Sequence, residues 1–258
     1  MAQYDNRIAQ AGYGSRTAVG VDEGLRAYML RVYNYMAGGV LLTGLVAYFV
    51  SAAAIANGPA GAAAKMGNKY LTTFGVALYG SPLKWVVMLA PIAFVFFLSF
   101  RIYKMSVGAA QVAFWLFAAA MGLSLSSIFL VYTGQSITQV FFVTAAAFAG
   151  LSLYGYTTKR DLSGMGSFLI MGVIGLFIAG LVNIWLQSGP LQFAISVIGV
   201  LVFAGLTAYD TQQIKDNYYE VMDDATAAGK AAIMGALNLY LDFINMFTSL
   251  LSLFGNKE

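Results

Sequence analysis

Seven long apolar runs alternate with short polar segments along the chain. A helix needs about 20 mostly apolar residues to cross the hydrocarbon layer of a bilayer. Only a turn at Gln187 to Pro190 separates the fifth run from the sixth, and it divides what would otherwise be one overlong helix. The pattern therefore predicts an all-α integral membrane protein whose spanning domain covers 33–254. The predicted spans are about 33–55, 83–103, 108–131, 138–156, 166–187, 190–209 and 232–254.

The segments outside these runs are polar or rich in small residues. Within the polar stretch 1–32, apolar residues at helical spacing begin at Val21 and alternate with Arg26 and Arg31. This spacing favours an amphipathic helix over 21–32 at the membrane surface, although a solvated tail fits it equally well. The loop 57–82 is rich in Gly and Ala, and its stretch Leu71–Tyr79 either folds back against the bundle or forms a mobile loop. Residues 255–258 are a short tail.

Composition supports lipid as the solvent and excludes several kinds of chemistry. Hydrophobic residues make up 60% of the 258 residues and charged residues only 10%, well away from the balance of soluble domains. There is no cysteine and no histidine, which excludes disulfides, thiol nucleophiles and imidazole catalysis. The net charge of +3 is small and its basic residues are scattered, so nucleic acid is not an expected partner.

The basic residues predict the orientation of the spans. Lys and Arg are enriched in loops on the cytoplasmic side of a membrane. With the N-terminus inside, the tail and inner loops collect Arg7, Arg16, Arg26, Arg31, Arg101, Lys104, Lys159, Arg160, Lys215 and Lys230. The other side collects only Lys65, Lys69, Lys84 and Lys257. We therefore expect a cytoplasmic N-terminus and a C-terminus on the outer side.

Asp242 is the outlier among the eleven acidic residues, because it lies well inside the last apolar run. A lone ionised carboxylate at that depth costs several kcal/mol, so the side chain should be neutral, paired, bound to an ion or facing water. The polar residues of this run are spaced by four, three, four and three, which places them on one face of the helix: Asn238, Asp242, Asn245, Ser249 and Ser252. The stripe lines either a hydrophilic route or a set of interhelical hydrogen bonds. We interpret Asp242 as functional, and Asn245 and the two serines as hydrogen-bonding residues.

Asp210 is the only plausible acidic partner for Asp242. It follows the sixth run directly, and taken alone it is typical of a carboxylate at a helix end. If the helix continues inward through Ile214, the two carboxyl groups can meet. Two carboxylates at close range share a proton, and their oxygens are ligands that suit calcium. The pair is thus a candidate pH sensor and calcium site.

Several other residues are candidates to support such a pair. Arg101, at the inner end of the second span, is a candidate counter-ion or an ordinary positive anchor, and Lys104 is more typical of an anchor. Asn183 and Tyr209 are candidate hydrogen-bond donors around the carboxylates, as are Asn238 and Asn245, with packing as the alternative for each.

Four stretches resemble the bacterial, YccA branch of the Bax inhibitor-1 family. They are Met121–Ser136, Tyr154–Leu162, Gly205–Lys215 and, above all, Leu239–Phe247, which reads LYLDFINMF. The resemblance runs from about Arg31 to Gly255. It implies a protein of the bacterial inner membrane with a seven-helix bundle in which the last helix is surrounded by the other six. It also implies an aspartate pair, matching Asp210 and Asp242, that makes a calcium leak sensitive to pH.

The same resemblance implies an arginine latch on the pair, for which Arg101 is the nearest match, about one residue out of step. Other members of the family look like regulators of membrane-anchored AAA proteases of the FtsH type, or suppressors of stress-induced cell death. The leading hypothesis is a pH-gated leak of cations, calcium above all, whose partners are calcium ions and protons, and the alternative is a regulator that binds such a protease or a cell-death partner. An intramembrane aspartyl protease is disfavoured because Leu241 and Asp242 lack the Gly-x-Gly-Asp pattern, so we expect no enzymatic activity.

Overall fold

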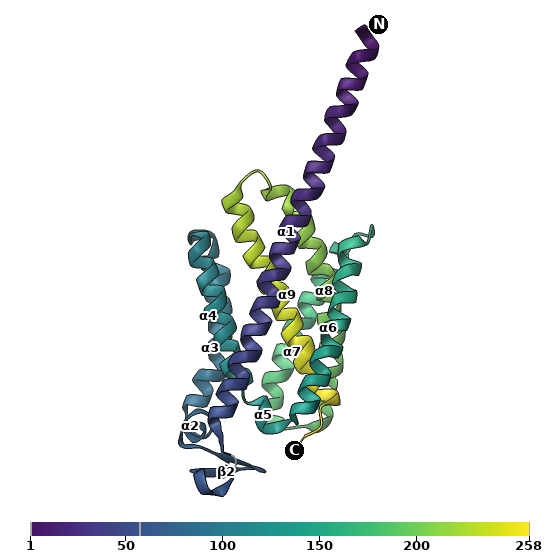
Figure 1. The fold of residues 1–258 in the computed structure, drawn as a ribbon. Coiled ribbons are helices and arrows are strands. Elements are labelled where there is room, and N and C mark those ends of the chain that lie inside the picture. The colour runs from purple at the N-terminus through teal and green to yellow at the C-terminus, as the bar shows by residue number, and fades with distance from the viewer. Residues whose placement is uncertain (1, 57, 258) are drawn as a thin grey trace.

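The computed structural model describes residues 2–56 and 58–257, with side chains from Glu23 onward. Within this part, seven helices are long and apolar enough to cross a membrane, which confirms the predicted all-α fold. They run antiparallel to their neighbours along the chain (Figure 1). The spanning helices are α1 (Ala2–Ala54), α3 (Leu83–Arg101), α4 (Val107–Leu125) with its short continuation α5 (Ile128–Val131), α6 (Gly134–Thr157), α7 (Ser163–Leu186), α8 (Gly189–Val221) and α9 (Ala225–Phe254).

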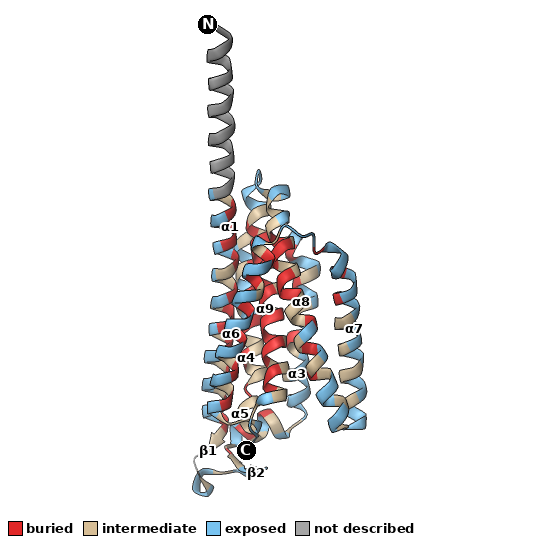
Figure 2. Cartoon of the chain, turned by 90° about the vertical axis from the view of Figure 1, so that its right-hand side faces the viewer, coloured by how far each residue is buried: buried red, intermediate tan, exposed pale blue. Residues whose placement is uncertain are grey.

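The last helix, α9, is the core of the bundle. Half of its most apolar window is buried, against 6% to 33% in the other spanning helices. Helices α1, α4, α6 and α8 pack along it, while α3 packs mainly on α4 and α7 mainly on α8. Figure 2 shows the buried residues concentrated on α9 and the outlying position of α7. The central last helix that the resemblance implied is therefore present, with two of its six neighbours in outer positions.

Hydrogen-bonding side chains set the turns between helices. Thr133 accepts a hydrogen bond from the amide of Ser136 at the start of α6, and Ser188 does the same for Leu191 at the start of α8. The Asp224 carboxylate accepts from the amides of Thr226 and Ala227 and so begins α9. These caps satisfy amides that a helix leaves unpaired at its N-terminus, so the short predicted turns end one helix and start the next.

The first spanning helix begins earlier than the apolar pattern predicts. The surface helix expected over 21–32 is instead part of α1, and Leu25, Met29 and Val32 are buried in the main core. The ring of Tyr28 packs against Tyr218 of α8, with 5.3 Å between their centroids. The apolar face is covered by protein because α8 extends far enough to reach it. The side chains of residues 1–22, including Val21, lie outside the described part.

Helix α8 also exceeds its predicted span, which ended at 209. It continues for twelve more residues to Val221, and Thr211, Gln212 and Ile214 are buried along this extension. Hydropathy falls there because the polar residues face other helices, and polar residues inside a bundle are tolerated where they find protein partners. Asp210 consequently lies in the interior of a helix. The condition for its meeting Asp242, a helix that passes Ile214, is fulfilled.

The stretch Leu71–Tyr79 folds back onto the bundle, which decides between the two expectations for it. Leu71 and Leu78 are almost fully buried, and the Tyr79 hydroxyl lies 2.8 Å from the Ser126 hydroxyl of the α4–α5 turn. Between α1 and α3 the chain forms a small antiparallel sheet in the order β1-β3-β2. The elements of this connection are β1 (Ile55–Ala56), η1 (Pro59–Gly61), β2 (Ala64–Met66), β3 (Lys69–Leu71), α2 (Thr73–Gly75) and η2 (Val76–Gly80), and η3 (Ile102–Lys104) follows α3 on the opposite side.

We call the side of the bundle that carries this sheet and the C-terminus the C-terminal side, and the side that carries the α8–α9 turn the N-terminal side.

Helices α6 and α8 approach each other closely at a glycine of α6. A Cβ added at Gly155 would overlap the carbonyl group of Ala208. At Gly150, five residues earlier on the same helix, a Cβ would meet no atom within 4 Å.

This contrast gives a matched pair of variants. We expect Gly155→Ala to lower stability by ~1–3 kcal/mol, because the backbone of α8 must move to admit the methyl group. Gly150→Ala should keep or slightly raise stability, since alanine favours helix by up to ~1 kcal/mol. The apparent melting temperature of the purified protein in detergent measures both. Equal melting temperatures for the two variants would contradict the close α6–α8 approach.

Candidate functional site

The polar stripe of α9 lies along α8, which runs antiparallel to it. Towards the C-terminal side, the Ser252 hydroxyl lies 3.0 Å from the Ser196 hydroxyl of α8. Further into the bundle, Ser249 contacts the position of Gly199. At the next level, Asp242 and Asp210 meet through their side chains. The α8–α9 seam is thus a continuous line of polar residues inside an apolar bundle.

The two aspartates form a carboxyl pair near the middle of the membrane. Asp242 lies twelve residues before the end of α9, or about 18 Å along the helix axis. Its side chain is only 4% exposed, whereas Asp210 is half-buried. Each carboxyl group is a hydrogen-bond neighbour of the other. Such a contact between two acids requires a shared proton or a bound cation between them.

No hydrogen-bond donor of the described residues reaches one oxygen of Asp242. Among the described residues, Asp242 Oδ2 is buried without a hydrogen bond, and the only other such side-chain atom is the Tyr28 hydroxyl. An unpaired acceptor at this depth is costly, and a proton or a cation would relieve it. The described residues hold no group of three acidic, histidine or cysteine side chains that could bind a metal. Calcium prefers six to eight oxygen ligands, so two carboxylates make a weak, open site rather than a closed one.

Three of the predicted supporting residues share helices with the pair but do not bond to it. The Asn245 amide donates to the carbonyl of Leu241 in its own helix at 2.8 Å. The ring of Tyr209 fills the space left by Gly166 of α7 and so points away from α9. Asn238 lies one turn from Asp242 on the same face and is half-buried.

Asn183 lies far from the aspartates, on the C-terminal side. Its amide donates to the Gln192 side-chain oxygen at 3.1 Å, and Gln192 in turn lies 3.5 Å from the Ser252 hydroxyl. Ser252 is ten residues, or about 15 Å, along α9 from Asp242. Tyr132 also bonds Ser252, and burial raises the pKa of the Tyr132 hydroxyl above its ordinary value. These residues close the C-terminal end of the seam with a hydrogen-bonded cluster.

The predicted cationic partners do not reach the pair. Arg101 and Lys104 are exposed near the end of α3, and no hydrogen bond or ion pair joins either to an aspartate in the described part of the chain. Two lysines on the same side are held by backbone oxygens instead. Lys215 donates to the Tyr156 carbonyl and Lys230 to the Tyr103 carbonyl, each at 3.0 Å. The structure therefore joins Asp210 to Asp242 and leaves Arg101 apart.

A chain of hydroxyl groups beside Asp210 was not predicted from the sequence. Tyr33 of α1 lies 2.7 Å from Ser152 of α6, which lies 2.8 Å from Thr211 of α8. The Thr211 hydroxyl donates its hydrogen to the Thr207 carbonyl, so it can only accept from Ser152. Ser152 therefore donates to Thr211, and Tyr33 donates to Ser152. The chain joins three helices at the level of the pair without offering Asp210 a donor. A pattern in one sequence could not reveal it, since serine and threonine are common in membrane helices.

Comparison with known proteins places this arrangement in a family. A family model described as inhibitor of apoptosis-promoting Bax1, Bax1-I, matches residues 25–258. The chain is 48% identical over 237 residues to the inner membrane protein YbhL of Escherichia coli, covering 91% of this chain and 94% of that protein. It is 44% identical over 260 residues to an uncharacterized protein of Caulobacter vibrioides, covering the full length of both. An uncharacterized membrane protein of Streptococcus pyogenes is 33% identical over 237 residues, covering 92% of this chain and 96% of that protein.

The family model spans nearly the whole bundle, including both helices that carry the aspartates, and the relatives align along almost their entire lengths. The chain is therefore a membrane protein of the Bax inhibitor-1 (Bax1-I) family.

Proposed function

We propose that the protein is a pH-sensitive cation leak, with calcium as its principal ion, and that the Asp210–Asp242 pair gates it without any chemical reaction. The observation that carries the proposal is the orphan oxygen of Asp242, which is buried in the central helix. A purely structural residue at this position would avoid the cost of a buried acid. In a site that exchanges protons for cations, the cost of the buried charge favours the binding of either a proton or a cation.

The α8–α9 seam supports a route for the ion. Its polar residues continue from the cluster around Ser252, past Ser249, to the carboxyl pair. With a proton between the carboxyl groups, the two helices are joined and the seam is closed. When the shared proton leaves, the two negative charges repel each other and attract a divalent cation. Only two carboxylates are available, so the ion binds weakly enough to leave again.

The orientation of the leak is also part of the proposal. Lys159, Arg160, Lys215 and Lys230 lie in or near the α6–α7 and α8–α9 turns, and Arg101 lies at the end of α3, all on the N-terminal side, whereas the C-terminal side of the described part carries four lysines. This asymmetry supports an N-terminus in the cytoplasm and a C-terminus outside, in a bacterial inner membrane like that of the relative from Escherichia coli.

The aspartates can be tested directly in vesicles. We expect Asp210→Asn and Asp242→Asn each to lower calcium flux by about tenfold, which corresponds to ~1.4 kcal/mol at the site, because a neutral side chain keeps the seam closed. Each variant should also flatten the dependence of the flux on pH. Asparagine keeps the size of the side chain and can still donate one hydrogen bond, so the fold should persist. The measurement is calcium entry into liposomes that contain the purified protein and a trapped fluorescent dye, between pH 5 and 8.

Asp223→Asn is the matched control, because Asp223 is exposed in the α8–α9 turn and should behave as the unmodified protein does. If both aspartate variants keep the flux and its pH profile, the leak proposal fails. The family's regulatory role, in which the chain binds an FtsH-type AAA protease or a cell-death partner, would then become the leading explanation.

Protons and calcium should compete for the pair. Because the same oxygens take either one, calcium binding should weaken as the pH falls. Titration of the purified protein with calcium, followed by tryptophan fluorescence, should give a dissociation constant that rises steadily from pH 8 to pH 5. The Asp242→Asn variant should show weaker binding with little pH dependence. A constant that does not change with pH in the unmodified protein would rule out the pair as the calcium site.

A further inference from the structure

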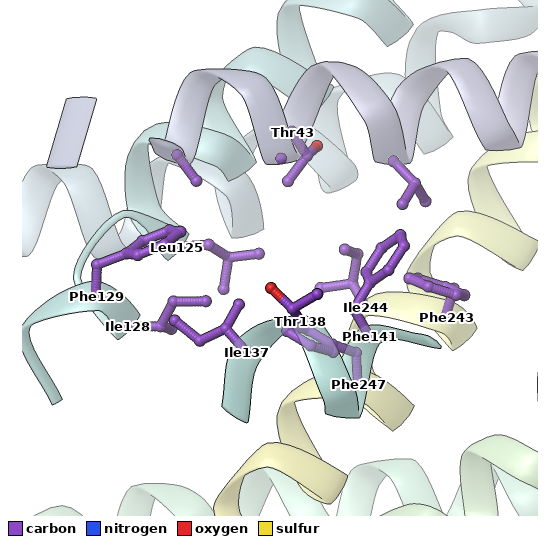
Figure 3. Close-up of a pocket in the computed structure, with 13 residues that line it drawn as sticks. Thr43, Leu125, Ile128, Phe129, Ile137, Thr138, Phe141, Phe243, Ile244 and Phe247 are labelled. Atoms are coloured by element: carbon purple, nitrogen blue, oxygen red, sulfur yellow. The ribbon is translucent and has the colours of Figure 1, made fainter. Parts of the chain in front are cut away.

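A second site lies on the opposite face of α9 from the aspartates. It is a cavity of about 220 Å³ lined by residues of α1, α5, α6 and α9 and by Leu125 at the end of α4. Figure 3 shows Phe243, Ile244 and Phe247 of α9 at one end, Ile137 and Phe141 of α6 below, and Thr43 of α1 above. Successive helix residues are about 100° apart, so Ile244 and Phe247 project roughly opposite to Asp242. The cavity is therefore separate from the polar seam.

The cavity lies at the depth of lipid chains and has its mouth at the lipid-facing surface. Phe247 is seven residues from the end of α9, about 10 Å along the axis, and Thr43 is eleven residues from the end of α1, about 17 Å. Half of the hydrocarbon layer is about 15 Å thick. Gly44 and Thr138, which line the cavity, are exposed, whereas its α9 residues are buried. The space thus leads from one leaflet, on the C-terminal side, to the central helix.

The lining offers a water molecule few hydrogen-bond partners, because both hydroxyl hydrogens are already used. The Thr43 hydroxyl donates to the Ala118 carbonyl and accepts from the Tyr240 hydroxyl, and the Thr138 hydroxyl donates to the Gly134 carbonyl. The remaining lining side chains are apolar. A buried water needs two to four polar partners, and apolar cavities of about 150 Å³ in other proteins stay dry and take up small hydrocarbons. The chemistry of this cavity suits a hydrocarbon chain.

We propose that the cavity binds one acyl chain of a phospholipid from the leaflet on the C-terminal side. The bilayer supplies this ligand at high concentration at the mouth, and the chain can enter sideways between α1 and α6 while the headgroup stays at the surface. The bound chain packs against Ile244 and Phe247 and so supports the back of the helix that carries Asp242. This site stands independently of the leak, because its evidence is the cavity and not the carboxyl pair.

Photolabelling tests the site in the full-length protein. The probe is a phosphatidylcholine with a diazirine near the middle of one acyl chain, mixed into liposomes that contain the protein and no calcium gradient. After illumination, digestion and mass spectrometry, we expect adducts on the α9 peptide that carries Phe243, Ile244 and Phe247. These residues are buried from the surrounding lipid, so only a chain inside the cavity can reach them. Exposed residues such as Leu45 and Phe142 should be labelled in any case.

Two substitutions at the mouth make the test decisive. Gly44→Leu has open space for its side chain and should fill the entrance, reducing the α9 adducts to background. Gly175→Leu, an equal change at an exposed position of α7 with open space, should leave them unchanged. If Gly44→Leu does not fold, Thr138→Phe blocks the same entrance from α6. The proposal is overturned if the unmodified protein carries no α9 adducts, or if the folded mouth variant carries as many as the control.

Discussion

The arrangement of the bundle depends on the burial of one carboxyl group in its central helix. Asp242 cannot face lipid, so α9 must lie where protein surrounds it, and its polar face must meet another polar face. Helix α8 provides that face, with Asp210, Ser196 and the small residue Gly199 along it. Helices α1, α4 and α6 then cover the apolar sides of α9 that the α8–α9 contact leaves open.

The fold could be predicted because a membrane-spanning helix needs a long run of apolar residues, which is visible in the sequence. All seven spans were recognisable from their apolar runs, and the position of Asp242 followed from periodicity alone. The boundaries were less predictable, because hydropathy reports contact with lipid and not the extent of a helix. Helix α8 continues for twelve residues after its apolar run because Thr211 bonds to Ser152 of α6 and Gln212 bonds to the turn between α6 and α7. The beginning of α1 was misplaced for the same reason, since Leu25 and Met29 are covered by protein.

The candidate site was predictable only in part. The contact of Asp210 with Asp242 was expected on the condition of a longer sixth helix, and the structure meets that condition. Asn183 was predicted to lie near the pair because the sequence indicates only how deep a residue lies in its span, and not which helix it faces. It belongs to the opposite end of the seam, next to Gln192. Which face a polar residue presents to which neighbour depends on packing between distant segments, and no local pattern encodes it. Arg101 is separated from the pair for this reason too.

The glycine contact between α6 and α8 has a mechanical consequence. With no side chain between Gly155 and the Ala208 carbonyl, these helices cannot slide or separate slightly without losing the contact altogether. The hydroxyl chain through Ser152 and Thr211 fastens the same two helices a short distance away. Together α6 and α8 form a rigid pair of helices, and Asp210 belongs to this pair. If the seam opens as proposed for the leak, the displacement is therefore expected in α9, the most deeply buried helix, and in the helices behind it.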